Sequence, residues 1–199
     1  MVGVLEVNKL IVESDNDKIF IEKLKSILNI DNLEKKLREL KLDSINKLGI
    51  LIDADEVGIE KRISEINGIL KKVGIEVEFK YINEFQKDIK NDIEIACHIL
   101  NIDDKGSLDN ILKTIAKGKS EYADCLKAWK ECLEDKGESV SDTIFTKFWV
   151  NNYLRFDTCT KKEQKQSSKK CNFEKALEKD TWDFEHKSLK SLKFFLKMF

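Results

Sequence analysis

The chain has 199 residues, of which 36 are Lys or Arg and 37 are Asp or Glu, so its formal net charge is -1. This balance excludes a protein that coats nucleic acid through a uniform excess of positive charge, although a local basic patch is compatible with it. Hydrophobic residues make up 41% of the sequence, and no apolar run of about 18 residues predicts a membrane span. The five cysteines are irregularly spaced, which favours thiols over a set of disulfides. We therefore expect a cytoplasmic protein with no membrane partner.

The first quarter of the chain predicts a strand followed by helices. Residues 7–12 form a short β-branched run, and a polar turn at residues 13–17 follows it. Apolar residues then recur at helical spacing over residues 20–28 and again over residues 33–40. Whether a short strand separates these two helical stretches stays open.

The next part of the chain repeats the alternation of strand and helix. Residues 48–52 are apolar throughout, as in a strand covered on both faces, and residues 59–70 carry a helical pattern. Residues 75–82 alternate strictly between apolar and polar, which predicts a half-exposed strand. A third apolar run at residues 93–102 precedes a helix predicted over residues 108–115.

The second half of the chain is predicted to be helical. Residues 122–133 and 144–153 carry wide apolar stripes at helical spacing, the second one rich in aromatics. Residues 161–170 are wholly polar and predict an exposed loop, and residues 189–199 predict a closing amphipathic helix. The chain is therefore expected to combine a small α/β layer with a helical cover.

Acidic residues follow the three apolar runs that predict strands, at residues 7–12, 48–52 and 93–102. Glu13 follows the first, Asp53 and Asp55 follow the central one, and Asp103 and Asp104 follow the third. In open parallel sheets the carboxyl ends of the strands form the active-site edge, so we expect these carboxylates to converge. A cluster of like charges is most easily tolerated around a cation, and oxygen ligands without His or Cys favour Mg²⁺ or Mn²⁺ over Zn²⁺. The other interpretation is that an Asp-x-Asp turn only caps the next helix.

Two segments together resemble the TOPRIM domain, whose signature is one Glu and an Asp-x-Asp. They are Leu10-Ile11-Val12-Glu13 and Gly49-Ile50-Leu51-Ile52-Asp53-Ala54-Asp55-Glu56. More narrowly, the chain resembles a family of small, stand-alone TOPRIM-related prokaryotic proteins of unknown function. Gly106-Ser107-Leu108-Asp109 is similar to that family's turn after the third strand, and Trp182-Asp183-Phe184-Glu185-His186 is similar to its C-terminal signature.

The resemblance implies a fold and a site. It implies an α/β fold with a TOPRIM-like, Rossmann-type parallel sheet flanked by helices, over residues 1–118, and a helical extension over residues 119–199 that packs on the core. The implied acid–base or metal-associated carboxylate is Glu13. The implied metal ligands are Asp53 and Asp55, with Asp109 and Asp104 completing a second metal position.

The expected function is therefore hydrolysis of phosphodiester bonds in nucleic acid or nucleotides by a Mg²⁺- or Mn²⁺-dependent enzyme related to the overcoming-lysogenization-defect nucleases. An alternative is a non-catalytic TOPRIM module that binds nucleic acid or a protein partner, and a homo-oligomer is also open. Ser14 where the family commonly has Gly, and Asp109 where it has a longer Glu, motivate that alternative.

A third interpretation is a haloacid-dehalogenase-like phosphatase. The run from Leu51 to Val57 fits the opening of that family, with Asp53 as the phosphoryl-accepting nucleophile and Asp55 as the general acid–base. That family also needs a late Gly-Asp-x-x-x-Asp motif, which the sequence lacks.

Several other side chains have a structural and a functional interpretation. Lys147 lies among aromatics on a predicted helix, where it can stabilise a phosphoryl transition state or reach solvent as an ordinary surface lysine. Trp149 and Tyr153 can stack nucleic-acid bases, but aromatics at helical spacing favour a core. Cys125 and Cys132 lie seven residues apart on one apolar face, which predicts core placement and not zinc binding.

Overall fold

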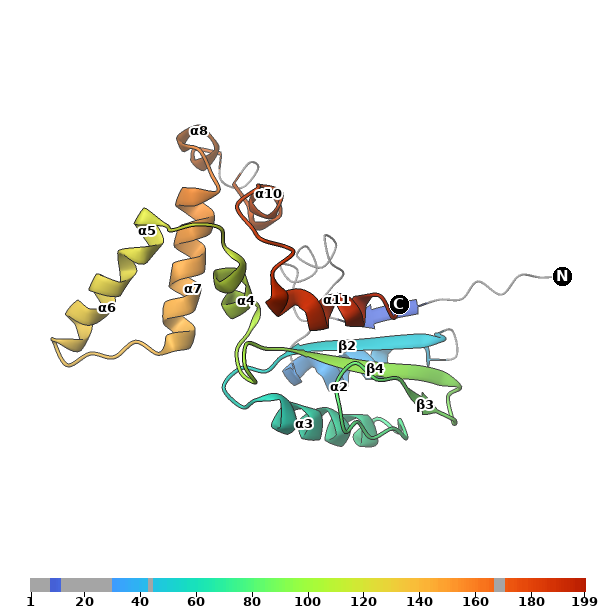
Figure 1. Ribbon diagram of the computed structural model, residues 1–199. Coiled ribbons are helices and arrows are strands. Elements are labelled where there is room, and N and C mark those ends of the chain that lie inside the picture. Colours follow the sequence, from blue (N-terminus) through green and yellow to red (C-terminus); the bar gives the residue numbers. More distant parts are fainter. Residues whose placement is uncertain (1–7, 12–29, 43–44, 167–170) are drawn as a thin grey trace. The chain divides into compact units, whose positions relative to one another are not determined.

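The structure is a computed structural model that describes residues 8–11, 30–42, 45–166 and 171–199 (Figure 1). The chain divides into two compact units, the first made of residues 1–107 and 190–199 and the second of residues 108–189. No helix in the described part of the chain is long and apolar enough to cross a membrane.

The first unit is an α/β layer, as predicted. Its elements are β1 (Asn8–Ile11), α2 (Ile30–Glu39), β2 (Lys47–Asp53), α3 (Ile59–Lys72), β3 (Gln86–Asp88), β4 (Ile93–Leu100) and α11 (Lys190–Leu196). The described strands form a sheet in the order β1-β2-β4-β3, in which β1, β2 and β4 run parallel. The sheet is mixed and not wholly parallel, since β3 pairs antiparallel with β4. A turn of four residues joins β3 to β4, and so short a connection can only reverse the chain direction.

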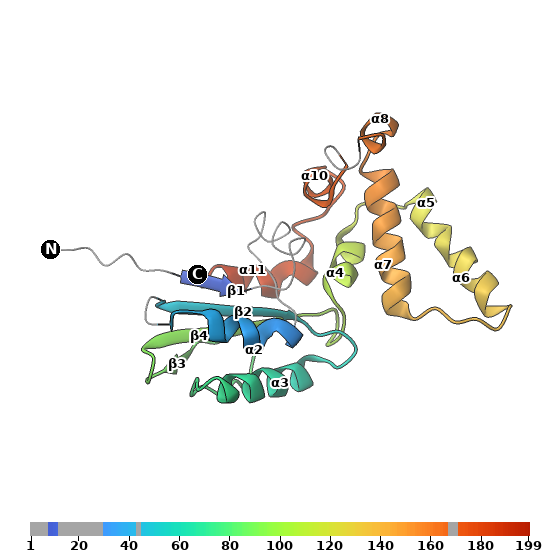
Figure 2. The ribbon, with the colours of Figure 1, turned by 180° about the vertical axis from the view of Figure 1, so that it is seen from behind.

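Helices cover both faces of this sheet (Figures 1 and 2). Leu48, Ile50 and Ile52 of β2 point to one face, and their β4 partners share it, because paired residues of parallel strands lie on the same side. Leu33 of α2 and Ile66 of α3 join them in one hydrophobic cluster. The apolar stripes predicted for residues 33–40 and 59–70 are thus confirmed as core-facing helices.

The opposite face of the sheet is covered by α11. His98 of β4 is 2% exposed, and its ring stacks on Phe195 with the centroids 5.4 Å apart. The Nδ1 atom of His98 lies 2.7 Å from Oδ1 of Asn83, whose Nδ2 donates to Oγ of Ser191 at 2.8 Å. A short polar chain therefore ties β4 to the C-terminal helix, and burial lowers the pKa of His98 to about 3.

Because His98 is buried, we expect the free energy of unfolding to fall in acid. The unfolded chain titrates this histidine near pH 6.5, so below that pH the unfolded state binds a proton that the folded state does not. The stabilising contribution is present above pH 6.5 and is lost as the pH falls towards about 3. Between pH 7.5 and pH 5, the wild type should lose about 2 kcal/mol more of its free energy of unfolding than His98→Gln. Urea unfolding at several pH values measures this difference, and parallel curves for the two proteins would contradict it.

Residues 75–82 do not form the predicted strand. Their burial does alternate, with Ile75 and Phe79 buried and Glu76 and Glu78 exposed. The backbone of Phe79, however, bonds to the side chain of Asn67: its N–H donates to Oδ1, and its carbonyl accepts from Nδ2, both at 2.8 Å. An amide side chain on α3 thus takes the place of a neighbouring strand, while the apolar residues still face the core.

The second unit is helical, as predicted. Its elements are α4 (Leu108–Ile115), α5 (Glu121–Asp124), α6 (Leu126–Glu134), α7 (Asp142–Asn152), η2 (Tyr153–Asp157), α8 (Lys161–Gln164), α10 (Phe173–Leu177) and η3 (Lys187–Leu189). Trp149 stacks on Tyr153, and Tyr153 meets Trp182 edge-on. All three rings are buried, which confirms the core interpretation of Trp149 and Tyr153.

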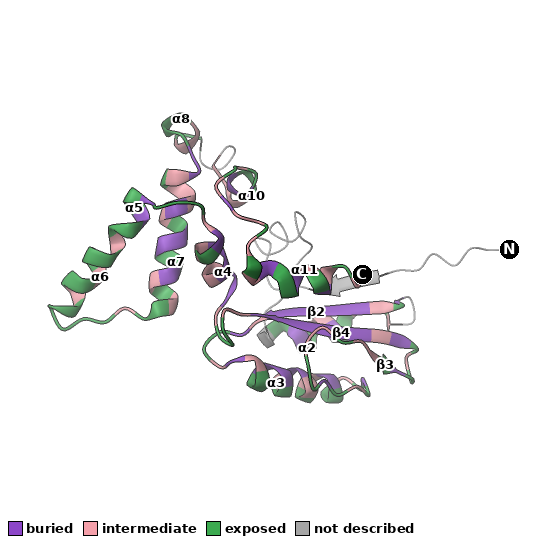
Figure 3. Cartoon of the chain, in the orientation of Figure 1, coloured by how far each residue is buried: buried purple, intermediate pink, exposed green. Residues whose placement is uncertain are grey.

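Helix α6 departs from the prediction. None of its residues is buried, and Figure 3 shows it in green and pink only. Cys125 and Cys132, predicted to lie in a core, are both exposed thiols. The helical periodicity was correct, but within the described residues α6 packs on α7 without burying any of its own side chains.

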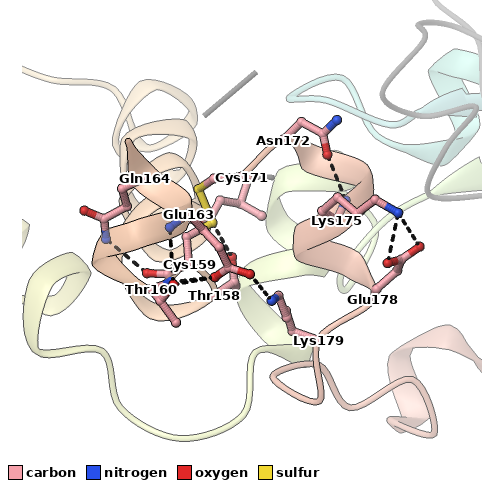
Figure 4. A network of polar contacts seen from close by, with 11 residues as sticks. Thr158, Cys159, Thr160, Glu163, Gln164, Cys171, Asn172, Lys175, Glu178 and Lys179 are labelled. Carbon is pink, nitrogen blue, oxygen red and sulfur yellow. Dashed lines mark hydrogen bonds and ion pairs between the residues drawn. A yellow bond between two sulfur atoms is a disulfide. The ribbon is translucent and has the colours of Figure 1, made fainter. Parts of the chain in front are cut away.

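A disulfide joins Cys159 to Cys171, contrary to the expectation that all cysteines are thiols (Figure 4). Residues 161–164, placed in a loop by the sequence analysis, form the short helix α8. A capping box begins this helix, with Thr160 and Glu163 bonding to each other's backbone N–H. Lys179 donates to Glu163 at 2.8 Å and, with the bonds from Thr160, lowers the pKa of Glu163 to about 2. Residues 161–166, the described part of this lysine-rich segment, thus follow a helix cap and lie next to a covalent bond.

The units do not coincide with the predicted domains of residues 1–118 and 119–199. Residues 108–118 belong to the helical unit, because α4 packs on α7. Residues 190–199 belong to the sheet unit, because the buried Phe195 covers the second face of the sheet.

Candidate functional site

The loops that follow β2 and β4 are tied together at the carboxyl edge of the parallel strands. Ala54 N–H donates to the Leu100 carbonyl at 2.9 Å. Asp55 and Gly106 then exchange two backbone hydrogen bonds of 2.8 Å each, and Asp55 has a φ of 49° in this bridge. Backbone hydrogen bonds therefore fix the two loops at the edge where we expected the carboxylates to converge.

A buried arginine occupies this edge. The side chain of Arg62, on the first turn of α3, is 9% exposed and donates to three acceptors. Its Nε bonds to the carbonyl of Asp53 at 3.0 Å, its Nη1 to Oε2 of Glu65 at 2.6 Å, and its Nη2 to Oδ2 of Asp55. The planar guanidinium thus fixes the end of β2 and the carboxylate that follows it.

The ion pair with Arg62 determines which oxygen of Asp55 can bind a ligand. The side chain is 49% exposed, and the ion pair uses Oδ2. Among the described residues Oδ1 accepts no hydrogen bond, so this oxygen is available to a cation. Asp55 can therefore act as a monodentate ligand held in position by Arg62.

Asp104 caps helix α3 from another loop. Asp103 and Asp104 form a tight turn in which both residues have positive φ, closed by hydrogen bonds between Ile102 and Lys105. Oδ1 of Asp104 accepts from the N–H of Ile59 at 3.0 Å, where α3 begins. Gly58 has a φ of 84°, which favours glycine, and a Cβ added there would lie only 2.7 Å from Oδ2 of Asp104, so a larger residue would displace this carboxylate. The carboxylate predicted as a metal ligand is thus committed to a helix N-terminus.

The two remaining described candidates lie in the helical unit. Asp109 opens α4, and Lys147 is exposed on α7. Burial raises the pKa of Asp109, while the charge of Lys147 acts in the opposite direction. The structure therefore brings these two candidates near each other, in a different unit from Asp53, Asp55 and Asp104.

Glu13 lies outside the described residues. Within the described ranges, no group of three His, Cys, Asp or Glu side chains is arranged to hold a metal ion. β1 ends at Ile11, which pairs with Ile50 of β2, and Glu13 follows two residues later in the sequence. The set of metal ligands expected from the sequence includes Glu13.

A hollow of about 410 Å³ opens beside Asp104 at the start of α3. Its lining combines apolar side chains with an exposed aromatic ring and charged side chains. The lining residues are Ile59, Glu60, Ile63, Lys80, Tyr81, Ile82 and Asp104. Its volume falls within the range of small-molecule sites, so an organic part of a substrate could lie next to the carboxylate edge.

Comparison with known proteins places the chain in a family. A family model described as "Protein of unknown function (DUF3226)" matches residues 7–199. The chain belongs to the DUF3226 family. No curated protein and no solved structure matches it. For this DUF3226 member, the case for a function therefore rests on the geometry of the carboxylate edge.

The sequence analysis of this DUF3226 protein did not identify Arg62. One signal was present: the chain has only three arginines among its 36 basic residues, and Arg62 lies one turn before Ile66 on the apolar side of α3. Arginine differs from lysine in forming several directed hydrogen bonds at once, which this position uses. An isolated arginine beside an apolar stripe, close in sequence to an Asp-x-Asp, could have indicated the clamp.

Proposed function

We propose that this protein is a Mg²⁺- or Mn²⁺-dependent phosphotransfer enzyme of the TOPRIM kind, which hydrolyses phosphodiester bonds in nucleic acid or nucleotides. The observation that supports it best is the position of Asp53 and Asp55 at the carboxyl end of β2, a central strand with a parallel neighbour on each side. In such sheets the carboxyl edge is where ligands bind. We propose further that the protein is cytoplasmic and that its sheet is arranged as in TOPRIM domains.

The donor atoms at this edge suit a hard divalent cation. The side chains assigned to the metal are carboxylates, and hard oxygen donors favour Mg²⁺ or Mn²⁺. A bound ion would neutralise charge on the scissile phosphate. Asp53 and Oδ1 of Asp55 would hold it, and Glu13 would accept a proton from the attacking water. Arg62 fixes the orientation of Asp55 through Oδ2.

The test is hydrolysis of a panel of DNA, RNA and nucleotide substrates in the presence of Mn²⁺. Asp53→Asn and Glu13→Gln should each lower the rate by at least about 100-fold, because each removes a negative charge from the reaction centre. Asp92→Asn is the matched control: its carboxylate is highly exposed in the same unit and should be dispensable. Equal rates in the wild type and both site variants would refute the assignment. Phosphoryl labelling of Asp53 would instead favour the haloacid-dehalogenase-like mechanism.

A second candidate function is a non-catalytic module that binds nucleic acid or a protein partner. The favouring observation is that two of the acids have structural partners: Asp55 pairs with Arg62, and Asp104 caps α3. Thermal melting with and without Mn²⁺ separates the candidates. Stabilisation by the metal without turnover on any phosphoester favours the module, whereas turnover that requires Asp53 favours the enzyme.

A further inference from the structure

The hollow beside Asp104 lies wholly within the sheet unit and is lined in part by an aromatic ring. Tyr81 contributes this ring and is 66% exposed. It makes no hydrogen bond or ring contact with another described residue. Proteins that recognise unpaired nucleotides commonly stack a base on such a ring. The hollow therefore has one of the elements that a base-binding site needs.

The backbone on both sides of Tyr81 is anchored. Two residues before it, Phe79 is 2% exposed, and both its N–H and its carbonyl bond to the side chain of Asn67 on α3 at 2.8 Å. Two residues after it, Asn83 donates its N–H to the carbonyl of Cys97 in β4, also at 2.8 Å. The position of Tyr81 is thus fixed before a ligand arrives, which lowers the entropic cost of binding.

Apolar side chains from two segments line the same hollow. Ile59 and Ile63 belong to the first turns of α3, and Ile82 follows Tyr81. Ile59 and Ile82 pack against the core cluster but are only partly buried. Asp104 holds the start of α3 by accepting from the N–H of Ile59 at 3.0 Å. The hollow therefore offers a fixed apolar surface to the flat face of a ligand.

The charges of the lining favour an uncharged group. Lys80 contributes one positive charge, and Glu60 and Asp104 contribute two negative charges, 1 − 2 = −1. A phosphate would be repelled by this lining, whereas a nucleobase is neutral near pH 7. Lys80 can donate hydrogen bonds and Glu60 can accept them, and the edge of a base presents both acceptors and donors. The lining thus matches a base better than it matches a phosphate.

The hollow is adjacent to the carboxylate edge. Arg62, which pairs with Asp55 at that edge, lies on α3 between the lining residues Ile59 and Ile63. Asp104 lies in the loop after β4, and this loop bonds to Asp55 through Gly106. A nucleotide whose phosphate is at the carboxylate edge would therefore have its base close to the hollow.

We propose that the hollow binds the base of a nucleotide, which stacks on Tyr81 and bonds along its edge to Glu60 and Lys80. The proposal rests on the proposed function for the position of the phosphate, and it narrows the substrate class. Bases inside a duplex are paired and stacked, and taking one out costs free energy. The substrate is therefore a free nucleotide or a single strand, and a double strand would be a poor substrate.

The experiment measures binding of the four common nucleoside 5′-monophosphates to the full chain by equilibrium dialysis in EDTA. At least one of them should bind, and Tyr81→Ala should weaken this binding by at least about 5-fold, as expected for the loss of one stacking contact. Tyr81→Phe keeps the ring and should bind as the wild type does. Tyr122→Ala is the matched control, since Tyr122 is also an exposed tyrosine (54%) but lies in the helical unit. Circular dichroism should show that all three variants fold.

The outcomes separate the base site from the proposed hydrolysis. Absence of binding by all four nucleotides overturns the base site, and so does equal binding to the wild type and Tyr81→Ala. Ribose 5-phosphate that binds as tightly as the nucleotides also overturns it, since the base would then contribute nothing. Binding in EDTA that depends on Tyr81, without hydrolysis of any substrate in Mn²⁺, supports the base site and refutes the enzyme. Hydrolysis that needs Asp53, with binding independent of Tyr81, supports the enzyme and overturns the base site.

Discussion

Replacing Phe195 with alanine is expected to lower the free energy of unfolding by about 4 kcal/mol. Phe195 is fully buried on the face of the sheet opposite α2 and α3. Its ring stacks on His98 and contacts Phe199 at a centroid distance of 5.3 Å. Truncation would remove these contacts and leave a cavity over β4, which the rigid sheet cannot close.

The neighbouring Phe194 provides the control for this experiment. It is 59% exposed on the same helix, so Phe194→Ala should change the free energy of unfolding by less than about 0.5 kcal/mol. Urea unfolding gives the energies, and hydrogen exchange in β4 shows whether the sheet unit is the part affected. Similar energies for the two variants would mean that α11 does not cover the sheet, and that residues 190–199 do not belong to the first unit.

Replacing Arg62 with methionine is expected to lower the free energy of unfolding by about 3 kcal/mol, because the variant loses a buried guanidinium that donates hydrogen bonds to three acceptors. Methionine preserves much of the apolar stem but removes the hydrogen bond that Arg62 donates to the Asp53 carbonyl. The carboxylates of Asp55 and Glu65 would then have to rely on solvent. Because Arg62 also orients Asp55, the proposed enzyme should lose activity in this variant as well.

Arg38 is the matched control for Arg62. Arg38 also donates to a carboxylate and a carbonyl, those of Glu34 and Lys72, but its side chain is 55% exposed. Exposed ion pairs contribute little, so Arg38→Met should cost less than about 1 kcal/mol. Equal losses for the two variants would refute the view that burial makes Arg62 the stronger clamp.

The part of the candidate site at the end of β2 followed from the position of acids in the sequence. Asp53 and Asp55 were placed correctly at the end of a buried strand, because an apolar run followed by a polar turn is a local pattern. The capping role of Asp104 and the clamp of Arg62 were not predicted. Both depend on hydrogen bonds between residues that lie apart in the sequence and meet only when the chain folds. For the same reason, Asp109 could not be assigned to the helical unit from its spacing alone.

The sequence by itself determined where most described helices and strands lie and which of their residues are apolar. Periodicity is a property of neighbouring residues, and it predicted β2, β4, α3 and α7 correctly. Only the tertiary structure decided what each apolar face meets. It placed the side chain of Asn67 against residues 75–82 where a strand was expected, brought α11 back to the sheet, and packed α6 on α7 without burying any α6 residue. The physical reason is that a pattern fixes the direction of a hydrophobic face, whereas the partner of that face depends on contacts between distant parts of the chain.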